Sequence, residues 1–332
     1  MRKITDHQLS TNSLLNWVLQ NKHTGALHET FHISMFGNHL RQSYRMLSKN
    51  EDTREQDLRI FAPEKYSKTP FHNVAEMQEI LESSGFFLHF FLHGSTADLK
   101  YIDGWSDFDA IAVVKDDALL RLNELLKTCA DLDNVMRRTD EHQHHGIHFV
   151  HECELQNWPN LYLPTSLFQD FVCLLSTKKI RYSEVDSSEH ELKRFLSIAD
   201  TFRSAMKTGE LRHHAKGGRY LRENYADMDT MYQMKYFLSV IMLLPALWLN
   251  LRGICCTKGE SFDLIREYFS DSQLELILKA SEIRAGWDDG RHSAGDRIPD
   301  FLKKLLGNDY LKRADVLISS MVAQIENDST RL

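Results

Sequence analysis

The chain has 332 residues, of which 42% are hydrophobic, and its formal net charge is -7. This length and composition allow a substantial buried core and favour two domains over one, while the negative charge argues against a protein whose main task is to grip long nucleic acid. The five cysteines are irregularly spaced and form no CxxC pair, which indicates neither a disulfide framework nor a structural zinc site and favours a cytoplasmic protein.

The first 72 residues are predicted to form a helical N-terminal extension. Residues 1–6 lack the apolar segment that a signal peptide requires. Apolar residues at helical spacing predict helices at 12–20 and 38–47. Pro63 and Pro70 then bracket a predicted linker to the next domain.

Residues 73–165 are predicted to form an α+β domain. Helical spacing from Val74 to Leu81 predicts a helix that ends at Gly85. Beyond it we expect a helix at 117–132 and four strands, at 86–92, 106–114, 135–138 and 146–152. This order is typical of a small mixed sheet backed by helices.

Two short motifs accompany the first two of these strands. Gly94-Ser95 follows the first strand, and Asp107 and Asp109 lie at the start of the second. Because side chains alternate along a strand, both carboxylates are expected on the same face. Paired carboxylates bind divalent metal ions, and backbone N–H groups at a Gly-Ser turn can hold a phosphate. Together the motifs predict a site for a metal-bound nucleoside triphosphate.

These motifs give the chain a resemblance to the nucleotidyltransferase superfamily over a short span. The segments that match the family signature are His93-Gly94-Ser95 and Ser106-Asp107-Phe108-Asp109. The apolar residue of the signature, Leu92, stands one place further back than usual. The resemblance implies that Asp107 and Asp109 bind Mg²⁺ or Mn²⁺ and that Gly94 and Ser95 hold the phosphates of an NTP substrate, with ATP favoured.

The family usually supplies a third carboxylate from a later strand, as a metal ligand or as the general base for the acceptor hydroxyl. Along the strand predicted at 146–152, alternate residues share a face, so Glu152 would point into the site with His148 beside it. Asp140 is the competing acid, and a histidine that takes over part of the role is the third option. The expected catalytic set is Asp107, Asp109 and Glu152, with Asp140 or a histidine as the alternatives to Glu152.

A histidine-rich stretch, residues 142–151, includes the predicted turn between the last two strands. Neutral imidazoles bind transition metals, but neighbouring residues on a turn point in different directions and no second ligand cluster accompanies them. A contact of His144 or His145 with phosphate or acceptor is therefore favoured over zinc. Solvated loop histidines are the competing interpretation.

Residues 166–332 are predicted to form a helical C-terminal domain, which is similar to the arrangement in family members that modify small molecules such as aminoglycosides. Apolar residues recur at helical spacing over 189–207, 228–251, 260–269, 272–285 and 311–325. The apolar run at 236–249 is shorter than a membrane span, which needs about 20 residues. It predicts a buried helix that is kinked or broken near Pro245.

Basic side chains of the helical domain are candidates for binding the triphosphate. Lys258 opens a predicted helix where related enzymes often place a phosphate-binding lysine, and Lys235 is placed similarly before the apolar run. For both, a helix-end lysine without a ligand is the alternative. A basic cluster would meet a triphosphate if a helix aligned it on one face, or would otherwise form a solvated surface; its members are Arg212, His213, His214, Lys216, Arg219 and Arg222.

The sequence thus predicts an enzyme, a Mg²⁺-dependent nucleotidyltransferase that moves an NMP from an NTP onto a hydroxyl of a small-molecule or protein acceptor and releases pyrophosphate. AMP is favoured as the group transferred. Long nucleic acid and membranes are not expected as partners, and a homo-oligomer is compatible with the sequence. Two alternatives stay open: a nucleotide cyclase or second-messenger synthase, and an inactive nucleotide-binding module of the same fold.

Overall fold

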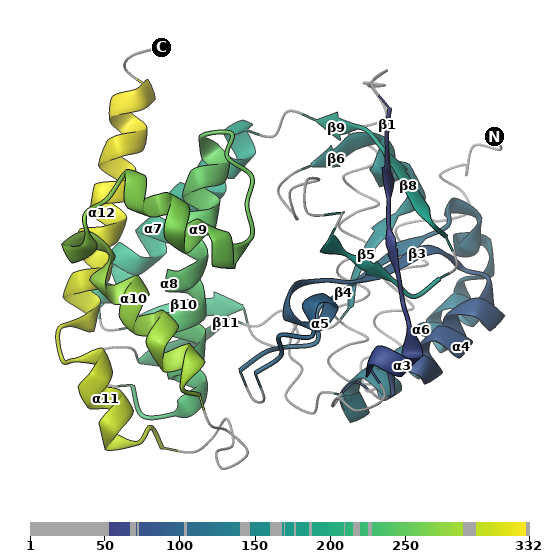
Figure 1. Cartoon of the computed structure of the whole chain (residues 1–332), viewed down its shortest axis with the longest axis horizontal. Coiled ribbons are helices and arrows are strands. Elements are labelled where there is room, and N and C mark those ends of the chain that lie inside the picture. Colours follow the sequence, from purple (N-terminus) through teal and green to yellow (C-terminus); the bar gives the residue numbers. More distant parts are fainter. Residues whose placement is uncertain are drawn as a thin grey trace.

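A computed structural model of the chain shows two lobes, one built on a β-sheet and one built mainly from helices (Figure 1). The class is α+β, as the sequence predicts. The structure describes residues 53–66, 71, 73–102, 105–139, 147–159, 168, 170–175, 177–185, 188–208, 210–214, 220–224, 228–287 and 297–329. The helices predicted at 12–20 and 38–47 lie outside this range.

The sheet lobe is organised around a five-stranded sheet with the order β2-β7-β3-β4-β5. The strands are β2 (Arg59–Ile60), β3 (Phe87–Leu92), β4 (Ala110–Val114), β5 (Ile147–His151) and β7 (Val172–Cys173). β3 runs antiparallel to β4 and β7, whereas β4 is parallel to β5 and β2 is parallel to β7. β4 is buried along its whole length, as its uninterrupted apolar sequence predicts.

One row of paired residues crosses the whole sheet near an edge. In sheet order the row consists of Arg59, Val172, Leu92, Ala110 and Ile147. Because β3 ends at this row and β4 begins at it, the segment after β3 and the segment before β4 meet at the same edge. Figure 1 shows α5 (Gly94–Asp98), which follows β3, on the side of the sheet lobe that faces the helical lobe.

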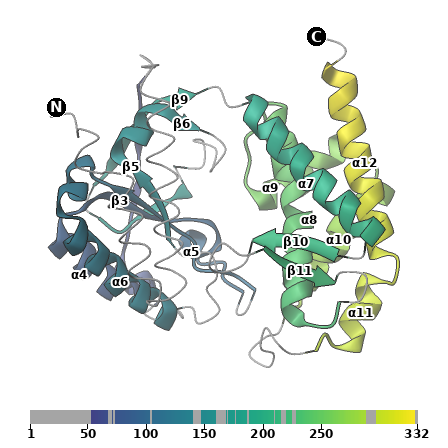
Figure 2. The same ribbon diagram turned by 180° about the vertical axis from the view of Figure 1, so that it is seen from behind.

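Two helices, α4 (Val74–Ser84) and α6 (Leu122–Thr139), pack side by side in the sheet lobe (Figures 1 and 2). α4 ends at Gly85, whose φ of 67° is the left-handed conformation expected of a helix terminator. The lobe also contains the short α3 (Pro63–Tyr66) and the 3-10 turns Asp116–Arg121 and Glu152–Asn157.

The prediction of a strand at residues 135–138 is wrong, because α6 continues through these residues. Val135 and Met136 are buried at helical spacing from Leu132, so they prolong the apolar stripe of the helix. A short apolar segment at the end of a helix is easily mistaken for a strand when it is considered without its neighbours.

The sheet lobe extends beyond the predicted limits of 73–165. β2 precedes this range and β7 follows it, yet both pair in the central sheet. The lobe also contains two small two-stranded ribbons. In the first, β1 (Arg54–Asp57) is antiparallel to β8 (Lys179–Tyr182). In the second, β6 (Trp158–Pro159) is parallel to β9 (Glu184–Val185). Pairing between distant segments leaves no local pattern, so the sequence places these strands outside the domain.

The helical lobe contains six helices and one hairpin within the described part of the chain. The hairpin pairs β10 (Glu210–His214) with β11 (Tyr220–Asn224) and interrupts the all-helical pattern predicted for 166–332. The helices are α7 (Ser188–Thr208), α8 (Met231–Leu251), α9 (Lys258–Leu264), α10 (Asp271–Ala285), α11 (Asp300–Leu306) and α12 (Tyr310–Ser329), with a 3-10 turn at Ile265–Glu267.

α8 is a core helix of this lobe, which confirms the predicted buried helix. Its residues Phe237, Ile241 and Trp248 are fully buried. The helix is not broken at Pro245, and the kink that the sequence predicts there as the other outcome stays a prediction. Among the described residues, Gln233–Leu251 is the one stretch long and apolar enough to cross a membrane, and 50% of it is buried inside the protein.

Candidate functional site

The Gly94 turn and Asp109 lie against each other at the sheet edge. The His93 N–H donates to the carbonyl of Asp109 over 3.2 Å, which extends the β3–β4 pairing by one step. Gly94 has a φ of 61°, and a Cβ atom at this position would lie 3.3 Å from Asp109 Oδ2. Glycine is therefore favoured both by the backbone conformation and by the space. The phosphate-binding candidates Gly94 and Ser95 consequently stand beside a predicted metal ligand.

Asp107 and Asp109 flank Phe108 just before β4 begins. Phe108 is fully buried, whereas both aspartates are partly exposed, which matches the alternation expected from the sequence. Thr96 Oγ1 donates to the carbonyl of Asp107 over 3.3 Å. This bond joins α5 to the aspartate segment, so the two motifs are held as one unit.

An ion pair connects Asp107 with Lys235 of the helical lobe. The Lys235 Nζ lies 2.6 Å from Asp107 Oδ1, and the two side chains are only 11% and 16% exposed. A charge-assisted hydrogen bond shielded from water is stronger than a surface ion pair. The structure thus brings Lys235, a candidate from the sequence, to the acid pair from the other lobe.

Lys258 and Arg284 add positive charge beside this ion pair. Burial, and after it the nearby Arg284, lowers the pKa of Lys258, while Asp109 and Asp107 act in the opposite direction. The Nε atom of Arg284 is buried and has no hydrogen-bond partner among the described residues. A buried cationic donor without a partner is costly. This corner of the site is therefore suited to an anion.

The loop between α5 and β4 is anchored in the core of the helical lobe. Trp105 is 4% exposed, and its ring meets that of Trp287 edge to face at a centroid distance of 4.8 Å. Within the loop, the N–H of Ile102 donates to Ser106 Oγ over 3.0 Å. The segment that carries Asp107 is consequently held by both lobes.

The structure does not bring Glu152 to the two aspartates. β5 is parallel to β4, and the two strands are in register over their full lengths. Asp109 precedes the start of β4, whereas Glu152 lies past the end of β5, where its Oε2 accepts the N–H of Asp116 over 3.3 Å. At about 3.3 Å per residue, the length of β4 separates the acids. The expected role of Glu152 in the acid set is corrected, because it lies at the opposite end of the sheet.

Of the candidates for the third group that the structure describes, His148 lies closest to Asp107 and Asp109 along the sheet. It pairs with Ile111 in β4, two residues beyond Asp109. Paired residues of parallel strands direct their side chains to the same face, so His148 shares the face of Asp109. The alternative acid Asp140, together with His144 and His145, lies outside the described residues, and its predicted role stays a prediction.

The described part of the predicted basic cluster lies in a hairpin and not in a helix. Arg212 of β10 pairs with Arg222 of β11 in the antiparallel register. Arg222 is therefore not aligned with the other basic residues by helical spacing, contrary to the prediction. His213 and His214 belong to the same β10 strand, whereas Lys216 and Arg219 lie outside the described part.

The residues at the sheet edge fit a divalent metal ion that shares its coordination with a substrate. Magnesium is commonly bound through one or two carboxylates plus substrate phosphates and water. Asp107 and Asp109 supply such oxygens, and the missing side chain at Gly94 leaves space beside Asp109 Oδ2. Among the described residues, no group of three or more His, Cys, Asp or Glu could hold a metal by itself. The ion pair with Lys235 would have to share or release Asp107 Oδ1.

Arg284 is a site residue to which no sequence pattern points. It lies in the last turn of α10, where a basic residue is ordinary because it complements the helix dipole. Only the tertiary structure places its charge close enough to Lys258 to lower the pKa of that lysine. Comparison of the chain with protein-family models, with curated proteins and with solved structures finds no match. The residues of this site are therefore what indicates a function for the chain.

Proposed function

We propose that the chain is a nucleotidyltransferase that moves a nucleotidyl group, with AMP favoured, from an NTP onto a hydroxyl of a small-molecule or protein acceptor. One observation carries this proposal: the Gly94 turn lies against Asp109 at a sheet edge, and Lys235 of the other lobe reaches the same acid pair. An open backbone turn, paired carboxylates and cations are the groups that this chemistry uses.

In the proposed reaction, the acceptor hydroxyl oxygen attacks the α-phosphorus of the NTP. A new O–P bond forms, the bond to the bridging oxygen breaks, and pyrophosphate leaves with the electron pair. A divalent ion held by Asp107 and Asp109 would stabilise negative charge on the phosphate oxygens. The hydroxyl proton needs a base, and Asp109 and His148 are the described candidates on this face of the sheet.

The charges of the described residues support a polyanionic substrate. Lys235, Lys258 and Arg284 outnumber Asp107 and Asp109, so this corner of the protein is locally positive although the whole chain is acidic. A triphosphate would meet the Nε atom of Arg284, which has no hydrogen-bond partner among the described residues, and the ammonium of Lys258, and would thereby lower the cost of keeping them away from water. The acidic chain as a whole disfavours a long nucleic acid as the acceptor.

The proposal is tested by pyrophosphate release with Mg²⁺ or Mn²⁺, each common NTP and a panel of hydroxyl acceptors. Asp107→Asn and Asp109→Asn should each lower the rate by about 100-fold or more, equivalent to about 3 kcal/mol of transition-state stabilisation, because an amide is a poor metal ligand. Thermal melting establishes that the variants are folded.

The matched control is Asp117→Asn, which changes an exposed carboxylate in the 3-10 turn after β4. This variant should transfer nucleotide at the wild-type rate. Full transfer in either site variant would contradict the proposal.

Product analysis in the same assay distinguishes the two alternative functions. A cyclic or linked nucleotide formed without any added acceptor would identify a second-messenger synthase. Metal-dependent nucleotide binding without pyrophosphate release would identify a non-catalytic binding module. The separation of Glu152 from the aspartates and the Lys235–Asp107 ion pair are the observations that favour this second alternative.

A further inference from the structure

Arg59 lies on the cross-strand row from which the candidate site projects. It belongs to β2 and pairs with Val172, which pairs with Leu92. Leu92 is the last residue of β3 and stands two residues before Gly94. No sequence motif points to Arg59, since it falls in the predicted N-terminal extension, before the linker that Pro63 opens. The sheet nevertheless brings it to the edge where α5 begins.

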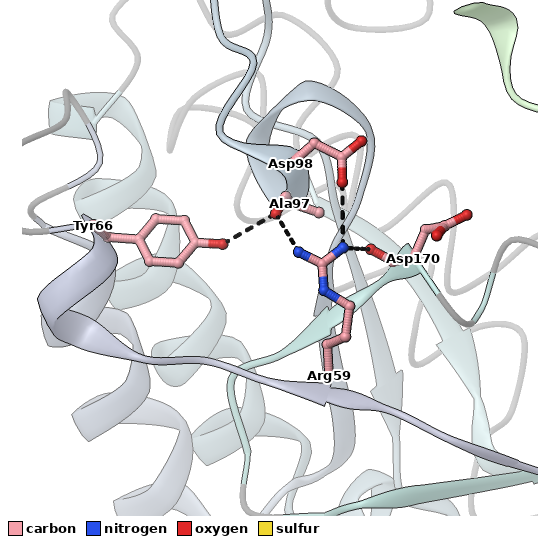
Figure 3. A network of polar contacts seen from close by, with 5 residues as sticks. All are labelled: Arg59, Tyr66, Ala97, Asp98 and Asp170. Atoms are coloured by element: carbon pink, nitrogen blue, oxygen red, sulfur yellow. Dashed lines mark hydrogen bonds and ion pairs between the residues drawn. The ribbon is translucent and has the colours of Figure 1, made fainter. Parts of the chain in front are cut away.

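The guanidinium of Arg59 holds three acceptors at once (Figure 3). Its Nη2 donates to the carbonyl of Ala97 over 3.0 Å, and its Nη1 donates to Asp98 Oδ1 over 3.2 Å and to the carbonyl of Asp170 over 3.1 Å. Tyr66 OH also points at the carbonyl of Ala97, over 3.5 Å. The planar fork of an arginine suits several acceptors, so Arg59 ties the end of α5 to the segment before β7.

α5 needs such external contacts because it is short and ends in an unfavourable conformation. It has five residues, and Leu99 closes it with a φ of 56°, the one positive φ of a non-glycine residue in the described part of the chain. A bulky side chain disfavours this left-handed conformation. Within the turn, Leu99 and Lys100 donate to the carbonyls of Thr96 and Ser95.

The carbonyl of Ala97 is satisfied differently from those of Ser95 and Thr96. Arg59 and Tyr66 reach it through their side chains. Carbonyls at the end of a helix lack partners within the helix and need a donor from elsewhere. Arg59 therefore supplies from β2 a bond that the five-residue α5 needs.

We propose that Arg59 is a positioning residue that holds α5 and, through it, sets the geometry of Gly94 and Ser95 for phosphate binding. The inference rests on the proposed function for the role of the phosphate turn. Arg59 acts through α5, whose first residue is Gly94, and the bond from Thr96 to the carbonyl of Asp107 carries the same restraint to the aspartate segment. Loss of Arg59 should therefore weaken NTP binding more than it slows the chemical step.

The test compares Arg59→Met and Arg59→Lys with the control Arg181→Met. Arg181 is also a basic residue of the sheet lobe with a bond to a carboxylate, from its Nε to Glu55 Oε2 over 2.8 Å, but that pair joins β8 to β1 away from α5. Two readouts are taken: hydrogen exchange of the amides of residues 94–100, and the KM for NTP beside kcat. The first does not depend on any activity.

In Arg59→Met the exchange of residues 94–100 should rise about tenfold and the KM for NTP about tenfold, with kcat changed less than about threefold. Arg59→Lys should recover part of both effects, because an ammonium can bond fewer of the three acceptors. Arg181→Met should change neither readout. A merely structural role would lower the melting temperature and leave the KM for NTP unchanged.

Unchanged exchange of residues 94–100 in Arg59→Met overturns the inference, whether or not the wild-type protein binds nucleotide. An unchanged KM for NTP in an active Arg59→Met variant also overturns it. Wild-type protein that neither binds NTP nor releases pyrophosphate overturns the proposed function instead, and the exchange readout then still decides whether Arg59 holds α5.

Discussion

His89 of β3 is a buried titratable residue outside the candidate site. It is 2% exposed, its ring stacks on Phe91 at a centroid distance of 5.2 Å, and its Nδ1 atom has no hydrogen-bond partner among the described residues. Burial lowers the pKa of His89 to about 4. The imidazole is thus held in its neutral form, since protonation in this apolar position would cost solvation energy.

The sheet lobe should consequently lose stability as the pH falls from about 6.5, the pKa of an unfolded histidine, towards 4. The unfolded chain binds the proton first, so the loss begins below pH 6.5 and is complete below the folded pKa of about 4. At pH 4.5 the loss from His89 should be roughly 2–3 kcal/mol.

Urea unfolding of the wild-type protein and of His89→Phe at pH 7.5 and 4.5 measures this loss as a double difference. The other acids titrate in both proteins and cancel, and phenylalanine keeps a ring for the stack on Phe91. Equal pH dependence in the two proteins would contradict the assignment of a depressed pKa to His89.

At the scale of elements, α9 presents Lys258 to the site through the cap at its N-terminus. Thr257 Oγ1 accepts the N–H of Glu260 over 3.2 Å, and Glu260 Oε2 accepts the N–H of Thr257 over 2.7 Å. This reciprocal capping box begins a helix of only seven residues. Lys258 is the first residue of the helix. Its orientation therefore depends on the side chain of Thr257, which does not itself reach Asp107 or Asp109.

Thr257→Ala should lower the free energy of unfolding by about 1 kcal/mol, the usual cost of a lost N-cap. It should also raise the KM for NTP, because Lys258 loses its fixed backbone. Thr257→Ser keeps the hydroxyl and serves as the control, with unfolding and KM near the wild-type values. Urea unfolding and steady-state kinetics check both effects, and identical behaviour of the alanine and serine variants would count against the cap.

The elements also differ in how much of them the sequence could predict. β4 is an apolar strand that is buried along its whole length, and α8 is a long apolar helix, so composition and periodicity suffice to find them. β2 has two residues and exists because β7, more than a hundred residues later, offers it a partner. The sequence predicts a strand at the end of α6 for a related reason, since a few apolar residues suit both structures.

At the scale of the whole molecule, the two lobes have separate hydrophobic cores. Trp105 belongs by sequence to the loop between α5 and β4, yet it is buried with the core of the helical lobe, against Trp287. Asp107, two residues later, pairs with Lys235 of that same lobe. The candidate site is consequently formed by residues of both lobes, and the sheet lobe alone does not contain it.

Trp105→Ala should lower the free energy of unfolding by about 3 kcal/mol or more, the usual cost of emptying a buried aromatic site. It should also reduce nucleotide transfer although no proposed ligand is removed, since the aspartate segment loses its anchor. Trp105→Phe, which keeps an aromatic ring for Trp287, should retain most of the stability and most of the nucleotide transfer. Urea unfolding, limited proteolysis of residues 99–109 and the transfer assay measure these effects; an alanine variant with wild-type transfer would contradict this role of the anchor.

The local part of the site can be found from short segments of the sequence. Gly94, Asp107 and Asp109 are found from a pattern because the turn and the alternation of a strand depend only on neighbouring residues. Their approach at one sheet edge follows from the antiparallel pairing of two consecutive strands, which is the simplest connection available. The α+β class follows from the same local patterns of strands and helices.

The distant groups that join these residues are brought there by long-range folding. The parallel pairing of β5 with β4 places Glu152 at the far end of the sheet and His148 on the face of Asp109. The packing of the lobes brings Lys235 to Asp107, and the edge strand β2 brings Arg59 to α5. The direction of strand pairing and the docking of two cores are set by the sum of many long-range contacts, which no short segment of the chain records.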